Sequence, residues 1–138
     1  GRTPLHIAAN DNQVDIAKVL LTAGANPNSA RRMGAGIRMY FTPLTEAASK
    51  GHIEIMQALI DHGVHINHTD PTGVTALHYS LPFSSHPHSA VRLLLANGAD
   101  TTLRTSKETP MPTLSNKTAL EIATDLGDKE LVMMLSDG

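Results

Sequence analysis

The chain has 138 residues, with 41% hydrophobic and 17% charged side chains, which is typical of a folded domain with its own core rather than a disordered segment. It has no cysteine, which excludes a disulfide framework and thiolate chemistry. The net charge of −2 argues against general nucleic-acid binding, and no apolar run approaches the roughly 18 residues that a membrane span requires.

Two short antiparallel helices are predicted at the start of the chain. Small apolar residues recur on one side of the first helix, and bulkier ones form a stripe on the second, at the spacing of amphipathic helices. The first set is Leu5, Ala8 and Ala9, and the second is Ile16, Ala17, Leu20 and Leu21. Helices this short cannot bury their apolar faces alone, so we expect neighbours of the same kind to pack against them.

Residues 42–67 repeat this design. Thr42 is a favoured N-cap residue, Pro43 suits the first helical position, and Gly63 is a typical stop for the second helix. Between these two copies, residues 29–41 hold about six extra residues, in which arginines alternate with apolar side chains. Two interpretations are open. The insertion is either a basic, apolar finger that binds an acidic partner or a longer hairpin that its own aromatic residues hold together.

The third copy departs most from the pattern. Pro82 follows Ser80 and Leu81 at once, which predicts an early end to the inner helix, because proline disfavours helix in the residue before it. The turn that follows, within residues 82–88, is two residues longer than in the other copies. Residues 101–117 then form a longer last finger, for which we expect a mobile loop, with a short extended docking segment as the alternative.

Four related tetrapeptides mark the starts of the copies, and the last of them predicts a capping box between Thr118 and Glu121. They are TPLH at residues 3–6, TPLT at 42–45, TALH at 75–78 and TALE at 118–121. Their spacings of 39, 33 and 43 residues correspond to a period of 33 with two insertions. T-P-L-H and a 33-residue unit of one turn and two helices are the signature of ankyrin repeats. The chain resembles the ankyrin repeat family over essentially its whole length.

The resemblance implies an all-α fold, an ankyrin-repeat solenoid of stacked helix–turn–helix units with β-hairpin fingers. We expect a single domain over residues 1–138, excised from a larger protein. The expected repeats lie at about 1–34, 35–67, 68–101 and 111–138. The resemblance also implies structural roles for His6 and His78, whose rings would bond to nearby backbone and to the threonine hydroxyl of the same copy.

The family's fingers and inner helices line a concave groove that binds other proteins, so the resemblance implies a binding surface here. We expect Phe41 and Tyr79 to be exposed neighbours on it, because aromatic side chains near arginine are typical of binding hot spots. The alternative is that the aromatic residues pack within their own insertions, which we favour for Phe83. The predicted partner-binding residues are Arg38, Tyr40, Phe41, Glu46, Lys50, Val74 and Tyr79.

The predicted function is therefore a non-catalytic protein–protein interaction module inside the cell, in the cytoplasm or nucleus, whose basic finger helps to orient an acidic partner. One alternative is a structural or regulatory spacer within a larger enzyme, ubiquitin-ligase adaptor or channel, and another is self-association through the ends of the stack. The sequence has no nucleophile elbow, Walker loop or H-E-x-x-H motif, and its eight histidines lack metal-site spacing. We expect no catalysis, metal or cofactor, and neither nucleic-acid binding nor membrane insertion.

Overall fold

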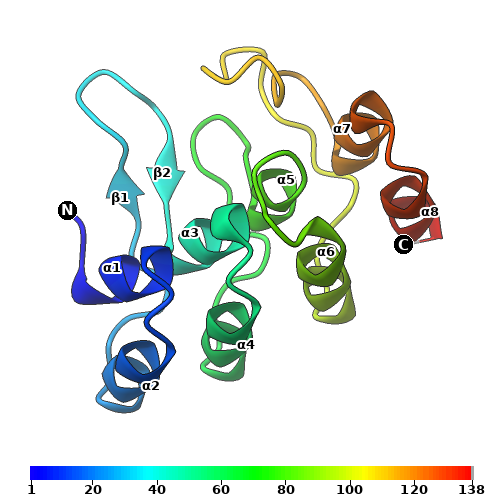
Figure 1. The fold of residues 1–138 in the computed structure, drawn as a ribbon. Helices are drawn as coiled ribbons and strands as arrows, with labels where there is room; N and C mark the ends of the chain where they lie inside the picture. Colours follow the sequence, from blue (N-terminus) through cyan, green and yellow to red (C-terminus); the bar gives the residue numbers. More distant parts are fainter. Residues whose placement is uncertain (138) are drawn as a thin grey trace.

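The computed structural model describes residues 1–137, and within that range the chain forms eight helices and a two-stranded sheet. Figure 1 shows the helices in two parallel rows, with the connecting fingers projecting on one side. The inner row is α1 (Pro4–Asn10), α3 (Pro43–Lys50), α5 (Ala76–Ser80) and α7 (Ala119–Leu126). The outer row is α2 (Val14–Thr22), α4 (Ile53–Asp61), α6 (Pro87–Ala96) and α8 (Lys129–Asp137).

Each helix packs against its partner in the pair and against its neighbours in the same row. This arrangement confirms the predicted all-α solenoid of four helix pairs, whereas the exact repeat boundaries remain a prediction. No helix in the described part of the chain is both long and apolar enough to cross a membrane.

A threonine starts every inner helix. The side-chain oxygens of Thr3, Thr42, Thr75 and Thr118 each accept the backbone N–H three residues further on, which satisfies one of the free donors of the first turn. In the first three copies the third helical residue returns a bond to the N-cap backbone and completes a capping box.

The predicted capping box of the fourth copy is only half formed. Glu121 N–H donates to Thr118, but the Glu121 carboxylate turns away to Arg104, with N–O distances of 2.7 and 2.9 Å. This bidentate ion pair is stronger than a single bond to a neutral N–H, and it lowers the pKa of Glu121. The start of α7 is therefore tied to the preceding finger rather than closed on itself.

The core runs through the stack without a break. Alanines at the centre of the inner helices let the rows approach closely, and bulkier aliphatic residues from the outer helices fill the space between them. The alanines are Ala8, Ala9, Ala47, Ala48 and Ala123, all fully buried. The outer-helix residues include Leu21, Ile55, Leu59, Val91, Leu94 and Leu131.

The two TPLH-type histidines connect each inner helix to the next finger. Thr3 N–H donates to His6 Nδ1 at 3.2 Å, so the neutral ring carries its proton on Nε2, which donates to the carbonyl oxygen of Phe41 at 2.9 Å. His78 makes the same two bonds, to Thr75 N–H at 3.0 Å and to the Leu103 carbonyl at 3.0 Å. Burial lowers the pKa of both rings. The structural roles predicted for these histidines are confirmed.

The inner helix of the third copy ends early, as predicted, with α5 stopping at Ser80. The longer turn after it folds back onto the second copy, where Ser85 Oγ donates to the Lys50 carbonyl at 2.9 Å. Gly51 lies directly under this turn with a φ of +75°. A β-carbon at Gly51 would approach Ser84 Oγ to 2.8 Å and His86 N to 2.9 Å, so the close packing requires a glycine.

The first finger is a hairpin of β1 (Arg31–Arg32) and β2 (Tyr40–Phe41), in antiparallel register with Arg31 opposite Phe41. Its loop continues the pairing, with Met33 N–H donating to the Met39 carbonyl at 3.1 Å. The insertion is therefore a longer hairpin, and binding of an acidic partner to it stays a prediction.

The last finger has neither helix nor strand, as predicted, but it is not a free loop. Ser106 N–H donates to the Thr72 carbonyl of the preceding finger at 2.8 Å, and Thr105 N–H donates to the Lys117 carbonyl at 3.0 Å. Leu114 is completely buried. These contacts connect the segment to the preceding finger and to itself, and the mobility expected from its sequence stays a prediction.

Candidate partner-binding groove

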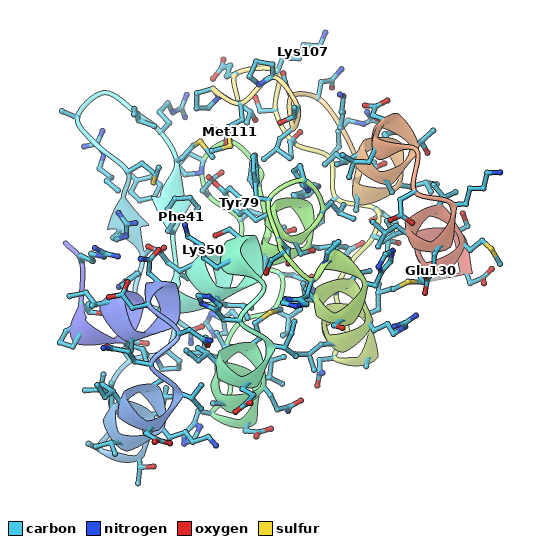
Figure 2. The ribbon with its side chains drawn as sticks, viewed as in Figure 1. Phe41, Lys50, Tyr79, Lys107, Met111 and Glu130 are labelled. Carbon is cyan, nitrogen blue, oxygen red and sulfur yellow. The ribbon has the colours of Figure 1, made fainter. Side chains whose placement is uncertain are left out.

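An open groove of about 440 Å³ lies between the fingers and the C-terminal ends of the inner helices. Figure 2 shows Phe41, Tyr79 and Lys50 gathered below Met111, between the hairpin and α5. The groove is lined by Asn10, Arg31, Met33, Phe41, Glu46, Ser49, Lys50, Tyr79, Phe83 and Met111. Four of the seven predicted partner-binding residues are therefore brought together here.

Two stacked aromatic rings form the floor of the groove. The ring centroids of Phe41 and Tyr79 lie 4.9 Å apart with an interplanar angle of 52°, a favourable tilted geometry. Only 7% of Phe41 and 1% of Tyr79 is exposed, so the prediction that both side chains are exposed is wrong, and their contribution to partner binding stays a prediction. Each ring covers the other, and Phe83, at 6.4 Å from the Tyr79 centroid, adds further cover.

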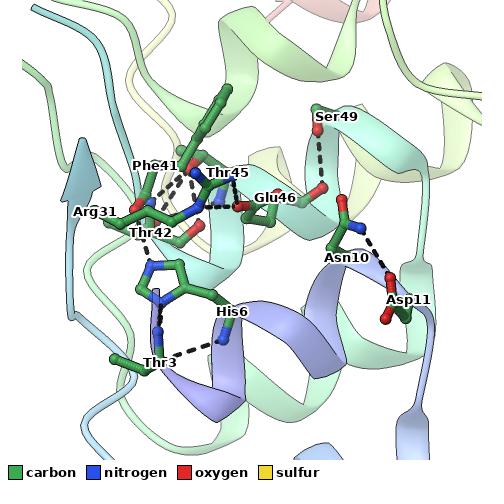
Figure 3. Close-up of polar contacts among 10 residues, drawn as sticks. All are labelled: Thr3, His6, Asn10, Asp11, Arg31, Phe41, Thr42, Thr45, Glu46 and Ser49. Atoms are coloured by element: carbon green, nitrogen blue, oxygen red, sulfur yellow. Dashed lines mark hydrogen bonds and ion pairs between the residues drawn. The ribbon is translucent and has the colours of Figure 1, made fainter. Parts of the chain in front are cut away.

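An ion pair fixes one side of this floor. The Arg31 guanidinium contacts the Glu46 carboxylate, at 2.6 Å from Nε and 2.5 Å from the nearer terminal nitrogen, and lies 5.4 Å above the Phe41 ring (Figure 3). The side chains are 18% and 4% exposed. Because Glu46 is neutralised from within the chain, the partner contact predicted for its carboxylate is not available unless this pair opens.

The Tyr79 hydroxyl is buried without a hydrogen-bond partner among the described residues. Burial raises the pKa of Tyr79, and the negative charges of Asp70 and Glu46 raise it further, so the phenol is neutral at physiological pH. An unpaired buried hydroxyl destabilises a folded protein by about 1–3 kcal/mol. The Tyr79 side chain therefore stabilises the fold through its ring and not through its hydroxyl.

Three predicted residues lie away from the groove. Val74 is 1% exposed and lies at the base of the second finger, where its N–H donates to the Asp70 carboxylate at 3.2 Å. Tyr40 is half-buried, and its N–H donates to the other oxygen of the same carboxylate at 3.4 Å. Arg38 is exposed and pairs with Glu108 at 2.9 Å. The structure gives all three a contact within the chain instead of a place in the groove.

Lys50 is the predicted residue whose placement agrees best with a binding role. It lies in the last turn of α3, its side chain is exposed, and it takes part in none of the ion pairs that the structure shows among the described residues. Arg31, the other cation of the lining, is already paired. The described lining therefore has one unpaired positive charge.

Sequence reasoning missed the apolar wall of the groove. Met33 is 40% and Phe83 is 43% exposed, and Met111 is partly buried against the core. Each comes from a different insertion: the first finger, the longer turn and the last finger. A signal was present in the sequence, because all three segments depart from the 33-residue period.

Nothing in the lining pairs a nucleophile with a base. Ser49 Oγ donates to the Glu46 carbonyl at 2.9 Å, and the described residues include no group of three or more histidine, aspartate or glutamate side chains that could hold a metal ion.

Two family models match the chain. One, described as ankyrin repeats in three copies, matches residues 33–105, and the other, described as ankyrin repeat, matches residues 1–32. The pair α7 and α8 lies outside both matches but packs on α5 and α6 in the same way.

Curated proteins with similar sequences belong to much longer chains. The transient receptor potential channel pyrexia of Drosophila melanogaster is 39% identical over 119 residues, covering 83% of this chain and 11% of the channel. Human ankyrin repeat and SOCS box protein 6 is 35% identical over 103 residues, covering 71% of this chain and 23% of that protein. Human Rabankyrin-5 is 33% identical over 105 residues, covering 72% of this chain and 9% of that protein. The chain spans less than a quarter of the length of these relatives.

Proposed function

This chain belongs to the ankyrin repeat family, and from that premise we propose that it binds a partner protein or peptide in the groove between its fingers and inner helices. Ankyrin repeats are generally protein-interaction modules. The observation that carries the proposal for this surface is the convergence of Met33, Phe83 and Met111 from three separate insertions on one groove.

The groove has the composition of a binding site. Large exposed apolar side chains that gather in one place are unfavourable in water and mark contact surfaces. Methionine side chains are flexible and adapt their shape to a partner. Met33 and Met111 provide this flexibility on the finger side of the groove, opposite the rigid ring of Phe83. The buried Phe41 and Tyr79 then act as a fixed support, which lowers the entropy cost of binding.

The direct test is affinity capture from lysate followed by mass spectrometry, on the wild type and on a Met33→Ser/Phe83→Ser/Met111→Ser variant. A Val19→Ser/Met133→Ser variant is the matched control, because these side chains are 67% and 66% exposed on α2 and α8, away from the groove. We expect the groove variant to lose partners that the control variant keeps, with both folded by thermal melt. The same partners on the groove variant as on the wild type would overturn the proposal.

A second candidate is the spacer role, in which the repeats pack against other parts of a larger protein. The exposure of Val19 and Met133 favours it, because both lie on outer helices at opposite ends of the stack. The test of this role is whether the rest of the larger protein, supplied as a separate chain, binds the wild type and the groove variant but not the Val19→Ser/Met133→Ser variant. Equal binding to all three proteins would contradict the spacer role at these two surfaces.

A further inference from the structure

The lining of the groove carries more positive than negative charge, and the excess positive charge is on one residue. The lining holds two cations, Arg31 and Lys50, and one carboxylate, Glu46. Arg31 and Glu46 are in contact with each other and largely buried, so neither is free to meet a ligand. Lys50 is exposed at the end of α3, and in the described part of the chain it forms no ion pair.

The position of Lys50 is well defined, although its side chain is exposed. The Lys50 carbonyl accepts the hydroxyl of Ser85, and Gly51 packs under the same turn, so this turn holds the backbone at Lys50. The hairpin arginines Arg32 and Arg38 lie outside the lining, and Arg38 is paired with Glu108 at 2.9 Å. Within the described lining, the unpaired positive charge is therefore on the helix side of the groove.

Next to this charge lies the apolar wall of Met33, Phe83 and Met111. A volume of about 440 Å³ is within the range of pockets that hold a small ligand and has room for two neighbouring side chains of a peptide. One of these must be apolar to cover the wall, and the other must be negatively charged to pair with Lys50.

We propose that the groove recognises a protein segment that places a bulky apolar side chain against Met33, Phe83 and Met111 and the carboxylate of a nearby aspartate or glutamate against Lys50. This inference depends on the proposed function, since it describes the ligand of the same groove. In this proposal Lys50 binds the acidic side chain of the ligand, whereas the sequence alone had suggested the arginines of the hairpin for this contact.

The experiment selects peptides from a display library of random 12-residue sequences on three baits: the wild type, Lys50→Glu and Lys129→Glu. Lys129 is the control, because it is an exposed lysine at the start of α8, far from the groove. We expect the wild type and Lys129→Glu to select apolar residues with an acidic residue within two positions. We expect Lys50→Glu to select a basic residue there, and to bind the wild-type peptides at least about tenfold more weakly.

Two further baits, Lys50→Gln and the Met33→Ser/Phe83→Ser/Met111→Ser variant, separate the role of the charge from that of the apolar wall. Lys50→Gln removes the charge without adding repulsion, so it should lose the acidic preference while retaining the apolar one. If selected peptides depend on Met33, Phe83 and Met111 but show no acidic preference on the wild type, the ligand assignment is overturned and the groove function stands. If peptides bind equally well to the Met33→Ser/Phe83→Ser/Met111→Ser variant, both proposals are overturned.

Discussion

The rings of Phe41 and Tyr79 lie against each other with centroids 4.9 Å apart, and this contact joins the base of the first finger to the inner helix of the third copy. The two residues are separated by the whole second helix pair in sequence. Their packing makes the floor of the groove part of the core, and its strength can be measured as stability.

Replacing Tyr79 with phenylalanine should stabilise the protein. The change keeps the ring that packs on Phe41 and removes a buried hydroxyl that has no hydrogen-bond partner. We expect the free energy of unfolding in urea to rise by about 1 kcal/mol. Tyr79→Ala is the contrast, because it also removes the ring and should lower the free energy of unfolding by about 3–5 kcal/mol. A clear loss of stability in Tyr79→Phe would show that the hydroxyl has a partner in solution.

Replacing Arg31 alone should lower the free energy of unfolding more than replacing both members of its ion pair. Arg31→Met leaves the Glu46 carboxylate, only 4% exposed, without a counter-charge, and we expect a loss of about 3 kcal/mol in the free energy of unfolding. The double variant Arg31→Met/Glu46→Gln leaves no buried charge and should recover most of that loss. A double-mutant cycle from urea unfolding measures the coupling. Additive effects of the two changes would contradict the pairing.

Acidification should destabilise the fold through His6 and His78. Burial lowers the pKa of both rings below the ordinary value of about 6.5, so the unfolded chain binds more protons than the folded one as pH falls below that value. The stability they contribute is present above about pH 6.5 and is lost as pH falls through their folded pKa values.

The measurement is the free energy of unfolding between pH 7.5 and pH 5, for the wild type and a His6→Gln/His78→Gln variant. The variant is expected to be less stable at pH 7.5, because glutamine does not reproduce the imidazole bonds to Phe41 and Leu103. It should also show a shallower loss of stability on acidification. Equal slopes for the two proteins would assign the pH dependence to other groups.

Gly51→Ala should destabilise the protein more than Gly63→Ala. Both glycines have φ near +75 to +79°, where a β-carbon is strained by about 1 kcal/mol. At Gly63 no atom lies within 4 Å of an added β-carbon, whereas at Gly51 the turn that carries Ser84 lies within 3 Å. The difference between the two variants in thermal or urea unfolding isolates the contact between the second and third copies. Equal losses would mean that the turn moves aside freely.

The repeat itself was predictable because its signals are local. Thr42 and Thr75 cap helices, Gly63 ends one, and Pro82 shortens α5, each acting within a few residues of its own position. Neighbouring copies then bury their alanine faces against one another. The structural roles of His6 and His78 followed from the same tetrapeptide.

The site was less predictable because its residues depend on segments that break the period. The sequence shows that Phe41 and Tyr79 are unusual for their positions, but their mutual burial depends on the length of the hairpin and on the path of the turn after α5. Glu46 and Glu121 occupy the first turns of helices, where a carboxylate is ordinary, and only the folded chain shows that each meets an arginine from a finger. Lys50 lies in the groove lining because the end of a regular helix fixes its location, and its contact with a partner stays a prediction.

The stacking of neighbours has a mechanical consequence. Because each helix pair packs mainly on the pair beside it, a chain pulled from its two ends should give way one pair at a time, releasing roughly 115 Å of chain for each 33-residue unit. The bridge between Arg38 and Glu108 links the first finger to the last, but its side chains are 61% and 72% exposed, so it adds little resistance. Under tension the molecule should unfold in steps of one helix pair at low force, and the unfolding force should change little with salt concentration.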